Sequence, residues 1–261
     1  MTQSQVKAGD FSALADDYSK YRPAYCESVL TALLALVGRS GADLDIVDVG
    51  AGTGIWTRMM AGRRPRSITA VEPNAAMREA GVADSQRLPI IWREGNGEAT
   101  GLADASADLL TMASSFHWVD FDRGVREFAR VLRPGGRFAA LWNPRHIESS
   151  PLLMEIEAQL TALKPDLKRV SSGRSGVTEG LTERLWASGL FDDVVYLEGR
   201  HTARLAPAQY IGAWRSVNDI QAQLGPAKFA AFLDFVERKV GHLPAVESVY
   251  ATRMWTARRK G

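Results

Sequence analysis

One stretch of the sequence restricts the possible folds more than any other. It is a short apolar, β-branched run that ends in three alternating glycines, Ile46-Val47-Asp48-Val49-Gly50-Ala51-Gly52-Thr53-Gly54. Such a run predicts a buried parallel strand, and the glycines predict a tight turn into a helix that begins at Ile55. A turn of this kind lets backbone N–H groups approach a ligand closely. The stretch therefore predicts an α/β sheet with a ligand site at the carboxyl end of this strand.

Strands and helices alternate through the following residues. Apolar runs predict further strands at 67–71, 89–92, 107–113 and 137–142. Helical spacing of apolar residues predicts helices at 26–37, 74–80 and 121–132, and Arg133-Pro134-Gly135-Gly136 predicts a sharp turn before the fifth strand. This alternation is typical of a doubly wound, mostly parallel α/β sheet.

The last third of the chain has a different pattern. Helices are expected at 151–163, 181–188 and 207–240, strands at 194–205 and 249–257, and a mobile loop at 164–180. We expect one domain over 1–261, in which a helical cap covers the open end of the sheet. Its expected parts are an N-terminal lid (1–28), a ligand-binding core (29–145), a cap and acceptor region (146–190 and 206–245) and a final strand hairpin (191–205 and 246–259).

Composition excludes several classes of protein. Lys and Arg number 32 against 30 acidic residues, and this balance offers nucleic acid no bulk attraction. The single cysteine, Cys26, excludes an intrachain disulfide and a cysteine-based metal cluster, and no His, Asp and Glu set has metal-ligand spacing. No apolar run is long enough to span a bilayer, and the N-terminus shows no secretion signal. We therefore expect a cytoplasmic protein without a metal or a membrane partner.

The glycine spacing indicates the class of ligand. Glu72, at the end of the second strand, can accept hydrogen bonds from both hydroxyls of a ribose. A dinucleotide turn has the pattern G-x-G-x-x-G, but Ile55 stands at the position of its third glycine. Asp48 would repel a pyrophosphate and would attract a cation. The residues thus favour a cationic adenosine cofactor without phosphate, while a nicotinamide oxidoreductase and a binding scaffold without turnover stay open as alternatives.

Several motifs in order resemble one family. They are Val47–Gly54, Val71-Glu72-Pro73, Glu98-Ala99 with Ser106-Ala107-Asp108, and Leu132–Gly136. Together they resemble the class I S-adenosylmethionine-dependent methyltransferases over roughly residues 10–145. Tyr21-Arg22-Pro23 and Phe116-His117-Trp118 are similar to the branch of trans-aconitate methyltransferase and of many small-molecule methyltransferases of biosynthetic clusters.

The resemblance implies a Rossmann-like sheet of seven strands whose last strand is antiparallel. It also implies S-adenosylmethionine as cofactor and S-adenosylhomocysteine as product. Gly50, Gly52 and Gly54 would contact the methionine part of the cofactor, and 96–98 would approach the adenine. The family usually has aspartate where Asn96 stands, and we expect the Asn96 carbonyl to accept from the adenine amino group instead.

The candidate site residues follow from this resemblance and the expected topology. Cofactor-binding candidates are Tyr21, Arg22, Asp48, Gly50, Ala51, Gly52, Thr53, Gly54, Glu72, Pro73, Met77, Asn96, Gly97, Glu98, Ser114, Ser115 and His117. Acceptor-binding candidates are Tyr18, Trp118, Trp142, Asn143, Arg145, Trp214 and Arg215. Among the arginines, Arg22, Arg145 and Arg215 are candidates to clamp an anionic acceptor by a bidentate contact.

The expected reaction is in-line methyl transfer to an oxygen or nitrogen of a small molecule, such as a biosynthetic metabolite or a small carboxylic acid. His117 follows the fourth strand and is the catalytic candidate, as a general base or as a residue that lines the pocket. The acceptor and the choice between monomer and homodimer are not determined. A nucleic-acid methyltransferase is disfavoured, because the Asn/Asp-Pro-Pro-aromatic motif is missing after the fourth strand.

Overall fold

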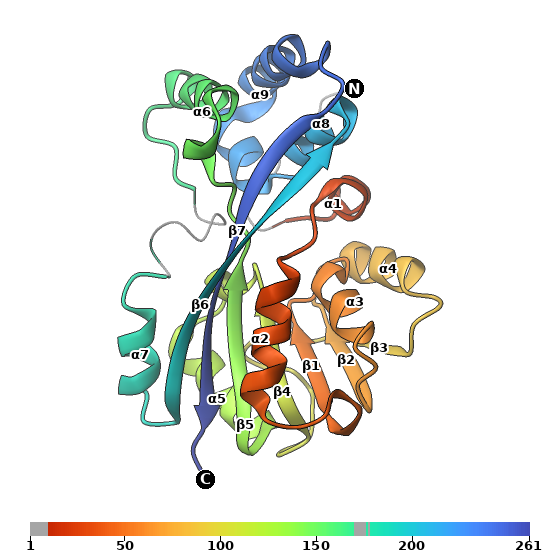
Figure 1. Ribbon diagram of the computed structural model, residues 1–261, viewed down its shortest axis with the longest axis vertical. Helices are drawn as coiled ribbons and strands as arrows, with labels where there is room; N and C mark the ends of the chain where they lie inside the picture. The colour runs from red at the N-terminus through yellow and green to blue at the C-terminus, as the bar shows by residue number, and fades with distance from the viewer. Residues whose placement is uncertain (1–9, 170–175, 177) are drawn as a thin grey trace.

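The computed structural model describes residues 10–169, 176 and 178–261. Within these residues, a seven-stranded sheet has the order β3-β2-β1-β4-β5-β7-β6 (Figure 1). The strands are β1 (Asp45–Val49), β2 (Ser67–Val71), β3 (Ile90–Arg93), β4 (Ala107–Ala113), β5 (Leu132–Trp142), β6 (Phe191–Leu205) and β7 (Val246–Arg259). β1 to β5 pair in parallel, whereas β7 is antiparallel to both of its neighbours. The doubly wound sheet with an antiparallel last strand is therefore confirmed.

The central strand β1 explains where a ligand site can form. Its apolar side chains are buried, as expected for a parallel strand covered on both faces. From β1 the chain passes to β2 and β3 on one side and then returns to β4 on the other. The strand order thus reverses between β1 and β4. In open α/β sheets this reversal leaves a crevice beyond the carboxyl ends of the strands.

Helices cover both faces of the sheet. α2 (Glu27–Val37) and α3 (Ile55–Ala61) bury Leu33 and Trp56 against one face. α5 (Phe121–Val131) and α7 (Leu181–Ala187) bury Phe128 and Leu185 against the other. α4 (Ala75–Asp84) joins β2 to β3. Short 3₁₀ turns lie at Gly41–Asp43, Phe116–Trp118 and Ile147–Ser149.

A helical cap forms a third apolar cluster. It consists of α6 (Pro151–Leu163), α8 (Pro207–Arg215) and α9 (Asn218–Val240), which pack around Trp214 and Phe232. α9 is kinked where Gly225, with φ of 71°, precedes Pro226. Figure 1 shows the cap beyond the carboxyl ends of the parallel strands, joined to the core by the long β6–β7 ribbon. The cap that the sequence predicts over the open end of the sheet is therefore present.

The N-terminal helix α1 (Ala15–Tyr21) lies between the core and the cap (Figure 1). A Cβ placed on Gly212 of α8 would come within 2.3 Å of the Tyr21 ring, so glycine permits this close packing. Pro23 separates α1 from α2, as expected.

Several element boundaries differ from the expected ones. β5 begins at Leu132 instead of Arg137, because Leu132 already pairs with Ala107 and residues 133–136 form a bulge before Arg137 pairs with Leu109. β6 begins at Phe191, and β7 extends over Val246–Arg259. The loop predicted at 164–180 falls partly outside the described residues, as does the start of the lid. The division into lid, core, cap and hairpin stays a prediction.

The helices and side-chain clusters of the described residues bear on membranes and metals. None of their helices is long and apolar enough to cross a membrane. Within the same ranges, no group of three His, Cys, Asp or Glu side chains is placed to hold a metal ion. The predicted cytoplasmic location and the choice between monomer and homodimer stay predictions.

Candidate functional site

Two cavities adjoin each other at the carboxyl ends of the parallel strands. The turn cavity is lined by the glycine turn, the end of β2, residues 96–98 and the end of β4. The arginine cavity lies between the core, α1 and the cap, and Arg22, Arg145 and Arg169 line it. The two cavities share a wall made of Phe11, Tyr18, Tyr25, Ile55, Ser114 and Trp118. A molecule in one cavity would therefore lie beside a molecule in the other.

The glycine turn forms one side of the turn cavity. The N–H groups of Gly50 and Ala51 donate to the Val71 carbonyl at 2.8 and 3.1 Å, which fixes the turn against β2. Gly50 and Gly52 have φ of 63° and 58°, in the left-handed region that favours glycine. A Cβ on Gly50 would approach the Ser115 Cβ to 2.6 Å. The turn thus requires glycine at Gly50 for both backbone conformation and space.

Glu72 presents an oriented carboxylate to the same cavity. Its Oε2 accepts from the Gly52 N–H at 2.7 Å, and its Oε1 accepts from the Asn74 N–H at 2.9 Å. Burial raises the pKa of Glu72, and these two hydrogen bonds act in the opposite direction. Each carboxylate oxygen retains acceptor capacity beyond its backbone partner. The arrangement suits a ligand with two neighbouring hydroxyl groups, as the sequence predicts.

Three predicted cofactor contacts of the glycine-turn segment do not line the turn cavity. The Asp48 side chain is fully buried beneath the turn, where it accepts from the hydroxyls of Thr57 at 2.5 Å and Thr111 at 2.8 Å. Thr53 is also fully buried, and Gly54 precedes α3 with φ of 79°. The residues that line the turn cavity do not include these three. Side-chain alternation along β1 directs Asp48 into the core instead of toward the ligand.

Burial raises the pKa of Asp48 to about 7, against the hydrogen bonds from both threonines. The folded protein therefore keeps the Asp48 proton over a pH range in which the unfolded chain has released it. Stability from this group falls as pH rises from about 4 to about 7, by up to roughly 4 kcal/mol. We expect the melting temperature of Asp48→Asn to decline less than that of wild type between pH 5 and pH 8. Asp45→Asn is the control, because Arg66 holds the pKa of Asp45 well below its usual range; an unchanged decline in Asp48→Asn would contradict the assignment.

Residues 96–98 line the turn cavity, but Asn96 does not have the expected role. Its Oδ1 already accepts from the N–H groups of Glu98 at 3.0 Å and Ala99 at 2.8 Å. The carbonyl that was expected to meet an adenine amino group thus closes a local turn instead. Glu98 accepts from the Asp120 N–H at 2.8 Å, which ties this turn to the start of α5. Gly97 lies against Val119, whose Cγ2 would be 2.4 Å from an added Cβ.

The remaining predicted contacts of the turn cavity come from the glycine turn, the segment after β2, α4 and the segment after β4. Ala51, Pro73, Met77, Ser114 and Ser115 all line it, as predicted. Ser114 has φ of 56°, which is uncommon for a residue with a side chain, and its Oγ lies 2.9 Å from the Tyr25 hydroxyl. Strained backbone of this kind clusters at functional sites. The Ser114–Tyr25 pair stands in the wall that the two cavities share.

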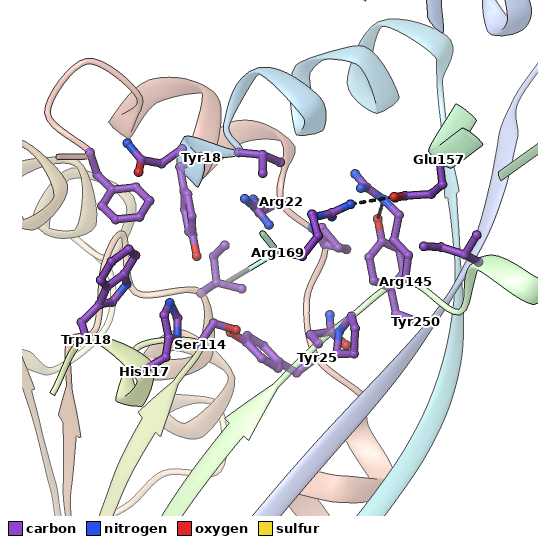
Figure 2. A pocket seen from close by; sticks show the side chains of 18 residues that line it. Tyr18, Arg22, Tyr25, Ser114, His117, Trp118, Arg145, Glu157, Arg169 and Tyr250 are labelled. Carbon is purple, nitrogen blue, oxygen red and sulfur yellow. Dashed lines mark hydrogen bonds and ion pairs between the residues drawn. The ribbon is translucent and has the colours of Figure 1, made fainter. Parts of the chain in front are cut away.

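The arginine cavity carries more positive than negative side chains. Arg22 donates from Nε to the Ser216 hydroxyl at 2.8 Å, and its guanidinium lies 4.9 Å from the centre of the Tyr18 ring. Arg145 donates to the Tyr250 hydroxyl at 3.2 Å. Figure 2 shows both arginines in this cavity, with Tyr18 between Arg22 and His117.

The cap contributes an ion pair and an aromatic surface to the same cavity. Arg169 pairs with Glu157 at 2.7 Å, drawn as a dashed line in Figure 2. The Arg145 guanidinium lies over the Trp214 ring at 4.1 Å. With three arginines and one glutamate among its lining residues, the cavity favours an anionic ligand.

His117 lies in this cavity with a specific partner behind it. The Trp142 indole N–H donates to His117 Nδ1 at 3.2 Å. Burial lowers the pKa of His117 to about 4, although the negative charge of Asp219 favours protonation. The ring is therefore neutral at physiological pH. Trp118 and Asn143 line the cavity as predicted, and Tyr18 lines both cavities.

Four predicted contacts lie elsewhere. Trp142 is fully buried behind His117, and Trp214 belongs to the cap core, where it supports Arg145. Arg215 is exposed on α8. Tyr21 packs on Gly212 and does not line either cavity. These side chains act on the site through other residues or lie outside it.

The sequence reasoning missed several lining residues. Phe11, Tyr25 and Ile55 belong to the shared wall, and Glu157, Arg169 and Tyr250 line the arginine cavity. Tyr25 lies two residues after the Tyr21-Arg22-Pro23 motif, so the sequence offers a reason to expect it at the site. Ile55 directly follows the glycine turn, whereas Phe11, Glu157, Arg169 and Tyr250 are scattered along the sequence and come together only through tertiary packing.

The known proteins that this chain resembles are methyltransferases. A family model described as a methyltransferase domain matches residues 47–140. An uncharacterized methyltransferase of Mycobacterium tuberculosis is 35% identical over 136 residues, which cover 52% of each chain. The ubiquinone/menaquinone biosynthesis C-methyltransferase UbiE of Rubrivivax gelatinosus is 40% identical over 97 residues, covering 37% of this chain and 38% of that protein. The matched segments thus span about half of these relatives or less.

A solved structure supports the fold over a longer stretch. It comes from Anaeromyxobacter dehalogenans and is described as a candidate type II methyltransferase. It aligns with a TM-score of 0.66 and 21% sequence identity, covering 91% of this chain and 98% of that one. At this identity the likeness concerns the fold alone.

Proposed function

We propose that the chain, whose residues 47–140 match a methyltransferase domain, is a class I S-adenosylmethionine-dependent methyltransferase that methylates an oxygen or nitrogen of a small anionic molecule. S-adenosylmethionine is the proposed methyl donor, and S-adenosylhomocysteine is the proposed product. A small carboxylic acid or another anionic biosynthetic metabolite is the proposed acceptor.

The observation that carries this proposal is the pair of adjoining cavities. One has the glycine turn and a carboxylate fixed by two backbone N–H groups, and the other has three arginines. A single shared wall separates them. Methyl transfer requires a donor and an acceptor to be held side by side and shielded from water. Two different cavities with a common wall meet this requirement.

The residues of the turn cavity fit the proposed donor. Glu72 would accept from the two ribose hydroxyls, and the glycine turn leaves room for the amino-acid part. Pro73, Met77 and Val119 offer apolar walls for a flat base. When bound, S-adenosylmethionine supplies a methyl group activated by a positively charged sulfur. Glu72 presents its carboxylate oxygens to this cavity, which is consistent with a cationic ligand.

The same residues count against a nicotinamide cofactor. Ile55 is the first residue of α3, and it lines both cavities. A dinucleotide-binding turn has its third glycine at this position. The nicotinamide alternative is therefore disfavoured.

An assay with tritium in the S-adenosylmethionine methyl group tests this function. The purified protein is incubated with cell extract, and label is followed in small-molecule, protein and nucleic-acid fractions. We expect label in the small-molecule fraction, and no such label with heat-inactivated protein. Label confined to protein or nucleic acid, or absent from every fraction, would contradict the proposal.

A further inference from the structure

The hydrogen bond from Trp142 determines which nitrogen of His117 carries the proton. An indole N–H can only donate, so the Nδ1 atom that it contacts at 3.2 Å must accept. A neutral imidazole carries one proton, which must then be on Nε2. Trp142 is fully buried in β5 and packs edge-on against Trp255, with ring centres 5.8 Å apart, so the donor is held in place.

The other ring nitrogen of His117 faces the arginine cavity without a protein partner. His117 lines this cavity, and Figure 2 shows its ring projecting into it below Tyr18. Its Nε2 atom is covered from solvent and has no hydrogen-bond partner among the described residues. A buried N–H without a partner is costly, and a bound ligand can satisfy it.

From these contacts we propose that His117 is a hydrogen-bond donor to the methyl acceptor, through Nε2–H, and that Trp142 is the positioning residue that fixes this tautomer. The inference rests on the proposed methyl transfer for the identity of the ligand, but the state of the ring does not depend on it. It replaces the expected general-base role of His117, because a nitrogen that already carries a proton cannot take another without forming a buried cation.

The charged groups around the cavity do not supply a base either. Glu157 is held by Arg169, and burial raises the pKa of Tyr25 far above its usual range, so that this hydroxyl keeps its proton. Asp219 is the acidic group whose charge favours protonation of His117, but burial outweighs it, and Arg22 and Arg145 add positive charge to the cavity wall. An acceptor that reacts through oxygen must then arrive without a proton.

This condition identifies a carboxylate as the acceptor class. A carboxylate is ionised at neutral pH, whereas a hydroxyl or phenol needs a base. One carboxylate oxygen forms a bond to the methyl carbon, the electron pair of the broken carbon–sulfur bond stays on sulfur, and no proton moves. The product is a methyl ester. His117 would orient the carboxylate through one oxygen while the other reacts.

Nitrogen-15 NMR of the imidazole rings tests the tautomer directly. The chain has four histidines, and the His117 signals are identified by their loss in His117→Gln. We expect wild-type His117 to show the Nε2–H tautomer alone, without titration from pH 5.5 to pH 8. In Trp142→Phe, which removes the indole N–H, we expect a mixture of both tautomers. Trp255→Phe is the matched control, since it disturbs the same aromatic pair without touching His117, and it should leave the tautomer unchanged.

The wild-type spectrum decides the tautomer even if Trp142→Phe fails to fold. A wild-type Nδ1–H tautomer, or a titration of His117 with a midpoint above pH 6, would overturn the inference. The same would follow if Trp142→Phe folded and kept a single tautomer. None of these results depends on whether the protein transfers methyl groups.

The tritium assay tests the role of His117 in transfer. We expect the labelling rate to stay constant from pH 8 to pH 6, and His117→Gln, whose amide N–H can replace the donor, to retain more activity than His117→Ala. A rate that falls about tenfold per pH unit below pH 7 would indicate a base and overturn the donor role. Complete absence of labelling would instead count against the proposed function.

Discussion

Replacing Glu72 with glutamine should weaken S-adenosylmethionine binding by roughly 100-fold, or about 3 kcal/mol, measured by calorimetric titration. The carboxylate accepts from Gly52 through one oxygen and from Asn74 through the other. A glutamine would place an NH₂ group against one of these N–H donors, so one backbone partner would be lost. It would also offer one acceptor fewer to the two ribose hydroxyls.

The control for this prediction is Glu79→Gln. Glu79 is exposed on α4, a short distance along the chain from Glu72, and undergoes the same chemical change. Its variant should bind S-adenosylmethionine like wild type. Equal affinities for Glu72→Gln and wild type would mean that Glu72 does not contact the cofactor.

Replacing Gly50 with alanine should remove detectable cofactor binding and destabilise the fold. The added Cβ would lie 2.6 Å from the Ser115 Cβ and 2.7 Å from its Oγ, at the base of the turn cavity. The left-handed backbone costs about 1–2 kcal/mol for alanine, and the steric clash adds about 1–3 kcal/mol. Chemical denaturation gives the loss of stability, and titration with S-adenosylhomocysteine gives the loss of binding.

Gly101→Ala separates strain from steric clash. Gly101 has φ of 70°, close to that of Gly50, but an added Cβ would find nothing within 4 Å among the described residues. This variant should lose only the 1–2 kcal/mol of backbone strain, roughly, and keep full cofactor binding. If Gly50→Ala lost no more stability or affinity than Gly101→Ala, the account of the turn would be wrong.

Local patterns in the sequence were enough to predict the core of the fold. The β-branched run before Gly50 and the apolar runs at 67–71 and 107–113 became β1, β2 and β4, because each strand is buried on both faces. The strand order then follows from the short connections between strands and helices. For the same reason the sequence alone predicts that Gly50, Gly52 and Glu72 lie at the ends of neighbouring strands.

The orientation of individual side chains could not be predicted in the same way. Asp48 stands in a strand whose two faces are both buried, so the sequence does not reveal which face it joins. Trp142 and Trp214 are aromatic residues near the site that serve as supports behind His117 and Arg145. The Asn96 carbonyl is used by a local turn. Each of these outcomes depends on packing between distant segments, which a single sequence does not record.

The residues around the proposed acceptor site show most clearly what a single sequence does not predict. Arg169 and Glu157, twelve residues apart in the sequence, form an ion pair. The cap is joined to the core by the β6–β7 ribbon. Ser114 and Tyr25 meet across 89 positions. Contacts of this kind determine which acceptor can bind, so sequence motifs alone do not identify the acceptor.

Titration of the wild-type protein with S-adenosylmethionine and, separately, with NADH tests the central claim most directly. The claim is that the turn cavity holds a cationic adenosine cofactor without phosphate. It predicts saturable heat of binding for S-adenosylmethionine, one molecule per chain, and no competition from NADH. Binding of NADH that displaces S-adenosylmethionine, or no binding of S-adenosylmethionine at all, would contradict it.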